Sequence, residues 1–375
     1  MSTAPLRTGN TAEDQRAMYA AALVARGLPV GDANAIAART QFPHFVRSTA
    51  PAPNSAAGQF LPEAQPLPLS KSEARLIEAS TAISLDEPNG DDLLFNHSIL
   101  CQIGLPRSRV EGREFQRNCG AAWLHLQAGL LDEGNGPVLQ PLPYGATPRL
   151  ALAWISTLAL RERSPEIDIG RSPTEFLRRI GMDGQGHRYR TLRCQLHALA
   201  ACRLQMGFRG RTFNSLTVEQ FDAWLPRGRG GASSWPGVLV LTPGFHRELL
   251  DHGVPLDRRA LNELKGSALG IDIYTWLAYR LHRIEGPAVS LPWSALRQQF
   301  AHEYTGTHAD DDFRKSFLHA LSKVQAVYPR AKVERCRGGL LLHGSPPPVA
   351  KRAVAASSLV GHVRNRSAAA QRGPA

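Results

Sequence analysis

The feature that most constrains this chain is a repeat in which residues of like character recur 122 positions apart. Trp154 and Trp276 stand at this spacing, and so do Arg161 and Arg283. Further pairs of apolar, hydroxyl and basic residues follow the same rule: Ile167 and Val289, Ile169 and Leu291, Ser172 and Ser294, Arg193 and Lys315, Leu196 and Leu318, His197 and His319, Leu199 and Leu321. Because the spacing needs no gap and far exceeds short solenoid periods, it predicts a duplicated unit. The alternative is that long helical segments match by chance.

In the second copy, residues 311–324 are predicted to form a helix with two unlike faces. One face is an apolar stripe at helical spacing: Phe313, Phe317, Leu321 and Val324. The other face is polar and basic: Arg314, Lys315, His319, Ser322 and Lys323. Asp310 to Asp312 suit the start of this helix, where carboxylates cap free N–H groups and face the positive end of the helix dipole.

A hairpin is predicted after this helix, over residues 331–342, with a turn at Gly338-Gly339. Its basic residues lie near the tip: Lys332, Arg335 and Arg337. A helix that can enter a DNA major groove, followed by a hairpin that lies along the adjacent backbone, is typical of a winged helix.

The first copy shows the same pattern over residues 187–225. Its helix, at 187–203, is predicted to bury Leu192, Leu196 and Leu199. A separate stripe carries Arg190, Arg193 and His197, and Arg188 lies two residues before Arg190. We predict that the wing of this copy runs from 204 to 225, with Arg209 and Arg211 at its turn.

The predicted fold class is α+β, with two tandem winged-helix domains produced by internal duplication and disordered tails at both ends. The predicted segments are a disordered Ala- and Pro-rich stretch (1–70), a helix with a β-rich preface (71–141), winged-helix domain 1 (142–245), winged-helix domain 2 (246–346) and a basic disordered tail (347–375). Capping boxes at Ser70 with Glu73 and at Ser172 with Glu175 mark two helix starts. Residues 238–241 are predicted to form a strand, and 227–231 a flexible basic loop.

Charge and cysteine usage narrow the function classes. The net charge of +12 over 375 residues favours a polyanionic partner, although a solvated basic face on an enzyme is the alternative. Five cysteines occur without a Cys-x-x-Cys pair, which indicates a reduced protein without a disulfide framework or a zinc site. No apolar run reaches the ~20 residues of a membrane helix, so no membrane partner is predicted.

Signals of catalysis are weak, and we predict a protein that is not an enzyme and has no cofactor, metal or catalytic residue. The chain has no Gly-x-x-x-x-Gly-Lys-Ser/Thr loop to cradle phosphates. It also has no His-apolar-His motif beside a tyrosine, which a metal-dependent nicking enzyme needs. Asp310 to Asp312 could bind a cation, but adjacent acids at a helix start are usually caps.

The basic residues of the two helices and hairpins are the candidate DNA-binding residues. Arginine and lysine hydrogen-bond guanine edges and neutralise phosphates, and histidine and serine supplement them. The set is Arg188, Arg190, Arg193, His197, Arg209, Arg211, Arg314, Lys315, His319, Ser322, Lys323, Lys332, Arg335 and Arg337. For each member, a solvated surface charge is the alternative. Two such helices would lie about one helical turn apart on one side of a duplex, roughly 34 Å, and would suit a directly repeated site.

The chain resembles the plasmid-encoded RepA-type replication initiators over roughly residues 110–348. The run Tyr274-Thr275-Trp276-Leu277-Ala278-Tyr279-Arg280 is the most specific part of this resemblance. The other matching stretches are 142–145, 148–149, 152–154, 166–170, 176–177, 254–257, 260–261, 272–281, 327–329 and 339–340. Two positions depart from the expected pattern: Ala301 stands where the family has glycine, and Asp312 occupies the place of Arg190 in the repeat.

The resemblance implies a cytoplasmic bacterial protein that binds direct repeats in double-stranded plasmid origin DNA. It also implies local duplex opening, recruitment of the host initiator and helicase without nucleotide hydrolysis, and a homodimer in exchange with a monomer. Two other hypotheses stay open. The chain could be a winged-helix transcriptional repressor that regulates its own gene, or an enzyme that nicks an origin.

Overall fold

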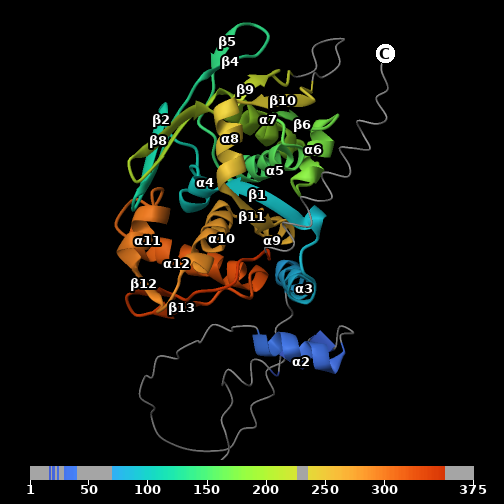
Figure 1. Cartoon of the computed structure of the whole chain (residues 1–375), viewed down its shortest axis with the longest axis vertical. Coiled ribbons are helices and arrows are strands. Elements are labelled where there is room, and N and C mark those ends of the chain that lie inside the picture. Colours follow the sequence, from blue (N-terminus) through green and yellow to red (C-terminus); the bar gives the residue numbers. More distant parts are fainter. Residues whose placement is uncertain are drawn as a thin grey trace, which may run out of the picture.

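The computed structural model describes residues 70–225 and 235–350, together with residues 17, 19–21, 23–24 and 29–39 (Figure 1). The predicted basic loop at 227–231 lies outside the described residues, and so does most of the predicted tail. The sequence predicted disorder throughout 1–70, but Val30–Arg39 forms helix α2. Its Ala33 and Ile36 are buried against Leu23 and pack beside Ile77, an apolar pattern that the Ala- and Pro-rich composition conceals.

The first repeated unit combines three helices with a three-stranded sheet. Its elements are α5 (Ala146–Glu162), β6 (Glu166–Asp168), α6 (Pro173–Arg179), α7 (Gly186–Ala201), β9 (Val218–Phe221) and β10 (Val238–Leu241). The strand order is β6-β10-β9, so the last strand lies between the other two. Ser172 accepts a hydrogen bond from the backbone N–H of Glu175 and begins α6, as the sequence predicted.

The second unit repeats this topology. Its elements are α10 (Ala268–Arg280), β12 (Val289–Pro292), α11 (Trp293–Phe300), α12 (Ala309–Val327), β13 (Val333–Cys336) and β14 (Gly339–Leu342). The strand order β12-β14-β13 again places the last strand in the middle. Because α5 and α10 also begin 122 positions apart, the topology supports the duplication.

The hairpin predicted as the wing of the first copy belongs to a different sheet. Strands β7 (Arg203–Phe208) and β8 (Arg211–Leu216) join β2 (Glu114–Cys119) and β3 (Ala122–Gln127) in the order β2-β3-β7-β8. The buried side chains explain this pairing, because Leu204 and Met206 of β7 lie opposite Leu126 and Leu124 of β3. The position equivalent to the second unit's hairpin is therefore held by β9 and β10.

The remaining elements pack around the two units. They are α3 (Lys71–Leu85), η1 (Gly90–Asp92), β1 (Leu93–His97), α4 (Ser98–Gln102), β4 (Leu130–Asp132), β5 (Pro137–Leu139), α8 (Pro243–His252), β11 (Gly253–Asp257), α9 (Arg258–Leu264) and η2 (Leu281–Arg283). The preface is extended as predicted, except for α4, and the predicted capping box at Ser70 and Glu73 is present. One buried apolar cluster runs through both units. No helix of the described residues is long and apolar enough to cross a membrane.

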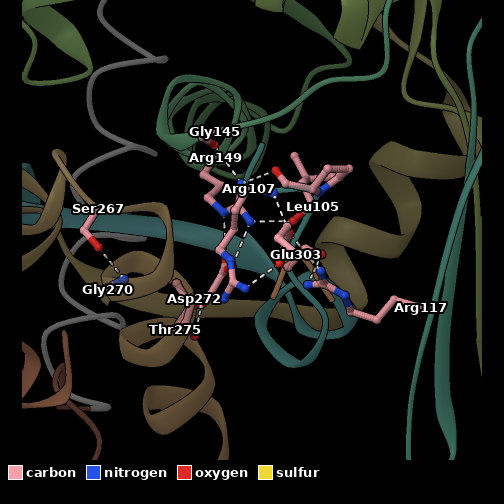
Figure 2. A network of polar contacts seen from close by, with 12 residues as sticks. Leu105, Arg107, Arg117, Gly145, Arg149, Ser267, Gly270, Asp272, Thr275 and Glu303 are labelled. Atoms are coloured by element: carbon pink, nitrogen blue, oxygen red, sulfur yellow. Dashed lines mark hydrogen bonds and ion pairs between the residues drawn. The ribbon is translucent and has the colours of Figure 1, made fainter. Parts of the chain in front are cut away.

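A buried polar network joins the first helices of the two units (Figure 2). Arg149 of α5 binds both carboxylate oxygens of Asp272 of α10, at 2.7 and 2.8 Å, and both side chains are buried. The same guanidinium donates to the carbonyl oxygens of Leu105, Pro106 and Gly145. The hydrogen bonds of the Arg149 guanidinium hold it in one position. Because Arg149 and Asp272 belong to different units, their ion pair helps to set how the two units lie against each other.

Glu303 extends this network towards the β-rich preface. Its carboxylate forms ion pairs with Arg107 and with Arg117, the latter at 3.2 Å. Burial alone would raise the pKa of Glu303, but the two guanidinium groups and the backbone hydrogen bonds together outweigh burial and lower it. Glu303 is therefore ionised at neutral pH and ties the loop after α11 to residues before the first unit.

Candidate nucleic-acid interface

Helix α12 presents the exposed basic face that the sequence predicted. Phe313, Phe317, Leu321 and Val324 are buried, which directs the opposite side of the helix outward. Lys315, His319, Ser322 and Lys323 are all exposed on that side. Within the described part of the chain, neither Lys315 nor Lys323 forms an ion pair, so both ammonium groups are available to phosphates.

Arg314 lies at the flank of this face and is partly engaged. Its guanidinium carbon lies 5.3 Å from the centre of the Trp293 ring, and its Nη1 is 3.9 Å from a carboxylate oxygen of Asp311. The side chain is half-buried by these contacts. Arg314 therefore supports the edge of the helix and contributes less free charge than the two lysines.

The hairpin β13–β14 adds basic residues at the same end of the molecule (Figure 1). All three predicted residues are exposed: Lys332 lies just before the first strand, Arg335 on it and Arg337 at the turn. The hairpin is tied to the helix because the Gln325 side-chain amide of α12 donates to the carbonyl oxygen of Val333, at 2.9 Å. Helix and hairpin are therefore in contact, and we call their exposed polar and basic residues together the unit-two basic face (Lys315, His319, Ser322, Lys323, Lys332, Arg335 and Arg337).

The first turn of α12 has the opposite charge. Asp310, Asp311 and Asp312 are exposed there, and Asp310 pairs with Arg297 at 2.7 Å. Three carboxylates would repel a phosphate at this helix start, although they suit the helix dipole. DNA would therefore meet the middle and the C-terminal half of α12, not its first turn.

In the first unit, the sequence predicted that His197 contacts DNA, but the structure does not place this side chain on the surface. His197 is buried, its Nδ1 lies 3.0 Å from Oε1 of Glu133, and its Nε2 accepts a hydrogen bond from the backbone N–H of Trp224 at 3.1 Å. Burial lowers the pKa of His197, and the neighbouring Glu133 carboxylate offsets only part of this effect. A neutral imidazole with both nitrogens engaged has nothing left to offer a base edge.

The arginines of α7 are also occupied, with one exception. Arg193 is half-buried and pairs with Glu133 at 3.2 Å, and Arg188 pairs with Asp183 at 2.9 Å. Arg190 is exposed and forms no ion pair within the described residues. The stripe of Arg190, Arg193 and His197 therefore exists on the helix, but a loop of the preface covers two of its three members.

Arg209 and Arg211 lie at the turn of the β7–β8 hairpin, away from the sheet of the first unit. Arg209 has a left-handed backbone, with φ of 49°, and lies over the Phe208 ring at 5.2 Å. Arg211 is exposed but pairs with Glu248 of α8 at 2.6 Å. The structure thus separates these two arginines from α7, with which the sequence had grouped them.

Glu133 is the residue that sequence reasoning missed. It follows β4 in the turn of the β4–β5 hairpin and reaches α7, more than 50 residues further along the chain. The sequence does predict the turn, through Asn135-Gly136. No local pattern, however, connects an acid in that turn to Arg193 and His197.

Among the described residues, no group of three or more His, Cys, Asp and Glu side chains could hold a metal ion.

The fold and its basic surface define an α+β protein with two topologically equivalent units, and a family comparison assigns part of it. Residues 142–293, which span the first unit and the start of the second, match the family model described as plasmid encoded RepA protein. This match supports the RepA-type family that the sequence resemblance predicted. No curated protein matches the chain significantly.

Two solved structures show a weaker similarity, and both contain domains 2 and 3 of RctB. A selenomethionine crystal structure of these domains is 14% identical, covers 66% of this chain and 98% of the RctB chain, and has a TM-score of 0.42. A second crystal structure, also 14% identical, covers 65% and 94%, with a TM-score of 0.40.

Proposed function

We propose that this protein is a plasmid replication initiator that binds directly repeated sites in origin DNA through two winged-helix units. The observation that carries the proposal is the unit-two basic face, whose lysines on α12 are exposed and unpaired within the described residues. The repeated topology supports it, because helix–strand–helix–helix–strand–strand with the last strand in the middle is the arrangement of a winged helix. The RepA match supplies the link to plasmid replication.

The two units contribute unequally in this proposal. The unit-two basic face offers five cations to phosphates: Lys315, Lys323, Lys332, Arg335 and Arg337. The first unit offers Arg190 on α7, with Arg209 and Arg211 on a separate hairpin. Unit two therefore supplies most of the electrostatic binding free energy, and unit one extends the contact along the duplex.

Affinity for a repeated origin sequence, measured at several salt concentrations, tests the proposal. Five phosphate contacts predict a log–log slope of about −4 to −5, since each contact contributes about −0.9. Replacing Lys323 with glutamine should make the slope shallower by about one. Replacing the exposed Arg247 of α8 with glutamine is the control, because it removes the same charge away from this face. A slope near zero in the unmodified protein would contradict the proposal.

We further propose, from the family resemblance, that the protein opens the duplex locally and recruits the host initiator and helicase in the bacterial cytoplasm. It would do so without nucleotide hydrolysis or strand cleavage, and would exchange between homodimer and monomer. A plasmid that lacks its own initiator gene separates this function from transcriptional repression, because a repressor alone would not restore replication. Supercoiled origin DNA incubated with protein and Mg²⁺ should stay supercoiled, whereas a nicking enzyme would relax it.

A further inference from the structure

A cavity of about 330 Å³ lies between the preface, the β7–β8 hairpin, α8 and the end of α10. It is lined by aromatic, basic and acidic side chains, with His97, Glu248, His252, Arg211, Tyr279 and Arg283 among them. The volume lies within the range of pockets that bind small molecules. Arg211 is the one residue of this lining that the DNA-binding proposal also uses, and the inference below does not depend on that proposal.

His97 places an unsatisfied hydrogen-bond donor in this cavity. Its side chain is 1% exposed, and its Nδ1 accepts a hydrogen bond from the backbone N–H of Ile99 at 3.2 Å. Burial and the neighbouring His252 lower the pKa of His97 to about 3, so the ring is neutral. Because Nδ1 is an acceptor in a neutral ring, Nε2 must carry the hydrogen. This Nε2 is buried without a hydrogen-bond partner.

Glu248 places an acceptor next to that donor. One carboxylate oxygen, Oε1, accepts from Arg211 at 2.6 Å. The other oxygen, Oε2, lies 3.6 Å from Nε2 of His97 and 3.6 Å from Nε2 of His252, beyond normal hydrogen-bond length. The cavity therefore holds a donor and an acceptor side by side, each with unused capacity.

The tautomer of His97 decides between two kinds of ligand. A metal ion at this site would need the lone pair of Nε2, but that nitrogen carries the hydrogen as long as Nδ1 caps α4. A ligand that offers an acceptor beside a donor has no such conflict. The hydrogen-bonding edges of nucleobases present this combination.

The rest of the lining suits a nucleotide. Phe208, Phe213 and Tyr279 supply aromatic surface for a planar ring. Arg211 and Arg283 supply guanidinium groups for a phosphate, and Arg283 is held over the Tyr279 ring at 4.0 Å. We propose that this cavity binds a nucleotide, with the base edge at His97 and Glu248 and the phosphate at Arg211 and Arg283.

Calorimetric titration of the full chain with ATP, GTP, CTP and UTP in turn tests this proposal. We expect saturable binding of one nucleotide per chain by at least one of them. His97→Asn keeps an oxygen that can cap α4 but shortens the donor, and should weaken binding about tenfold or more. Arg283→Ala, an exposed change that leaves the core intact, should weaken the triphosphate more than the corresponding nucleoside. Arg247→Ala, on the exposed side of α8, is the matched control and should bind normally.

The other possible results of these titrations also test the proposal. If a short single-stranded oligonucleotide binds with the same sensitivity to both variants and the free nucleotides do not, the base comes from an unpaired strand and the chemistry of the site stands. If no nucleotide or oligonucleotide binds at millimolar concentration, or if both variants bind like the unmodified protein, the proposal is wrong. Zn²⁺ binding that disappears in His97→Asn would overturn the tautomer argument and replace the nucleotide with a metal.

Discussion

Helices α7 and α12 occupy the same place in the repeated topology, yet only α12 leaves its basic face open. Arg193 and Lys315 are equivalent positions, and so are His197 and His319. In α7 the arginine pairs with Glu133 and the histidine is buried. In α12 the lysine and the histidine are exposed. The two units therefore share a topology, but the turn of the β4–β5 hairpin covers the basic stripe of α7 through Glu133.

The N-terminal ends of the two helices also differ in charge: here α7 is basic and α12 is acidic. α7 begins with Arg188 and Arg190, whereas the equivalent positions of α12 are Asp310 and Asp312. A phosphate would be attracted to the first turn of α7 and repelled from the first turn of α12. If both helices bind DNA as proposed, this difference in charge would favour different contacts for their first turns.

The largest loss of stability is expected from a substitution where the two units meet. Asp272→Ala leaves Arg149 buried without its partner, and should lower the free energy of unfolding by about 3–5 kcal/mol. Urea denaturation followed by circular dichroism measures this. Asp312→Ala, an exposed change on α12, should cost less than about 0.5 kcal/mol. Equal losses in the two variants would show that the junction does not hold the units together.

The next largest loss of stability is expected at Gly104, which lies against the same Arg149–Asp272 ion pair. A Cβ at Gly104 would lie 2.4 Å from Oδ1 of Asp272, so Gly104→Ala forces the ion pair to shift. We expect a loss of about 1–3 kcal/mol in unfolding experiments. Gly266→Ala is the matched control, since its added methyl group meets nothing within 4 Å. If Gly104→Ala is as stable as the control, the junction is looser than described.

The pH dependence of stability separates the two equivalent histidines. Burial lowers the pKa of His197 below its usual 6.5 in the folded state. The unfolded chain therefore binds a proton first, and stability present above pH 6.5 is lost as the pH falls below it. His197→Gln should reduce this loss between pH 7.5 and 5.5 in urea titrations, and His319→Gln, on the exposed face of α12, should not. Equal behaviour of the two variants would contradict the burial of His197.

The smallest expected effect is on DNA affinity, and it concerns the contact that covers the basic stripe of α7. Glu133→Gln removes the charge that neutralises Arg193 while keeping a side chain of the same size. We expect DNA affinity to rise by about two- to fivefold, which corresponds to roughly 0.4–1 kcal/mol, because one more guanidinium becomes available. Fluorescence anisotropy with a labelled origin repeat measures it. Asp222→Gln, outside this contact, should affect affinity less, and a fall in affinity with Glu133→Gln would show that the hairpin assists binding.

The sequence predicted the second unit well because its elements are local. The helix at 311–324 appears as Ala309–Val327, and the hairpin at 331–342 as β13 and β14. The capping residues Ser70 and Ser172 also mark real helix starts. Each of these depends on contacts within a few residues, so periodicity and turn signals are sufficient.

The first unit was harder to predict from the sequence because its structure depends on contacts between residues that are far apart along the chain. Strand β6 could pair with either later hairpin; it pairs with β10, while β7 pairs with β3 from the preface. The burial of His197 depends on Glu133 and Trp224, and neither is near it in sequence. The candidate site in unit two could therefore be predicted by residue, whereas in unit one only its position on α7 could.

The most direct test of the account compares equivalent cations in the two helices. Lys315→Gln and Arg193→Gln each remove one charge at the same place in the repeat, and affinity for a directly repeated origin sequence is measured against salt for both. The account predicts that Lys315→Gln weakens binding and makes the log–log slope shallower by about one, while Arg193→Gln leaves the slope unchanged. A shallower slope with Arg193→Gln and none with Lys315→Gln would contradict it.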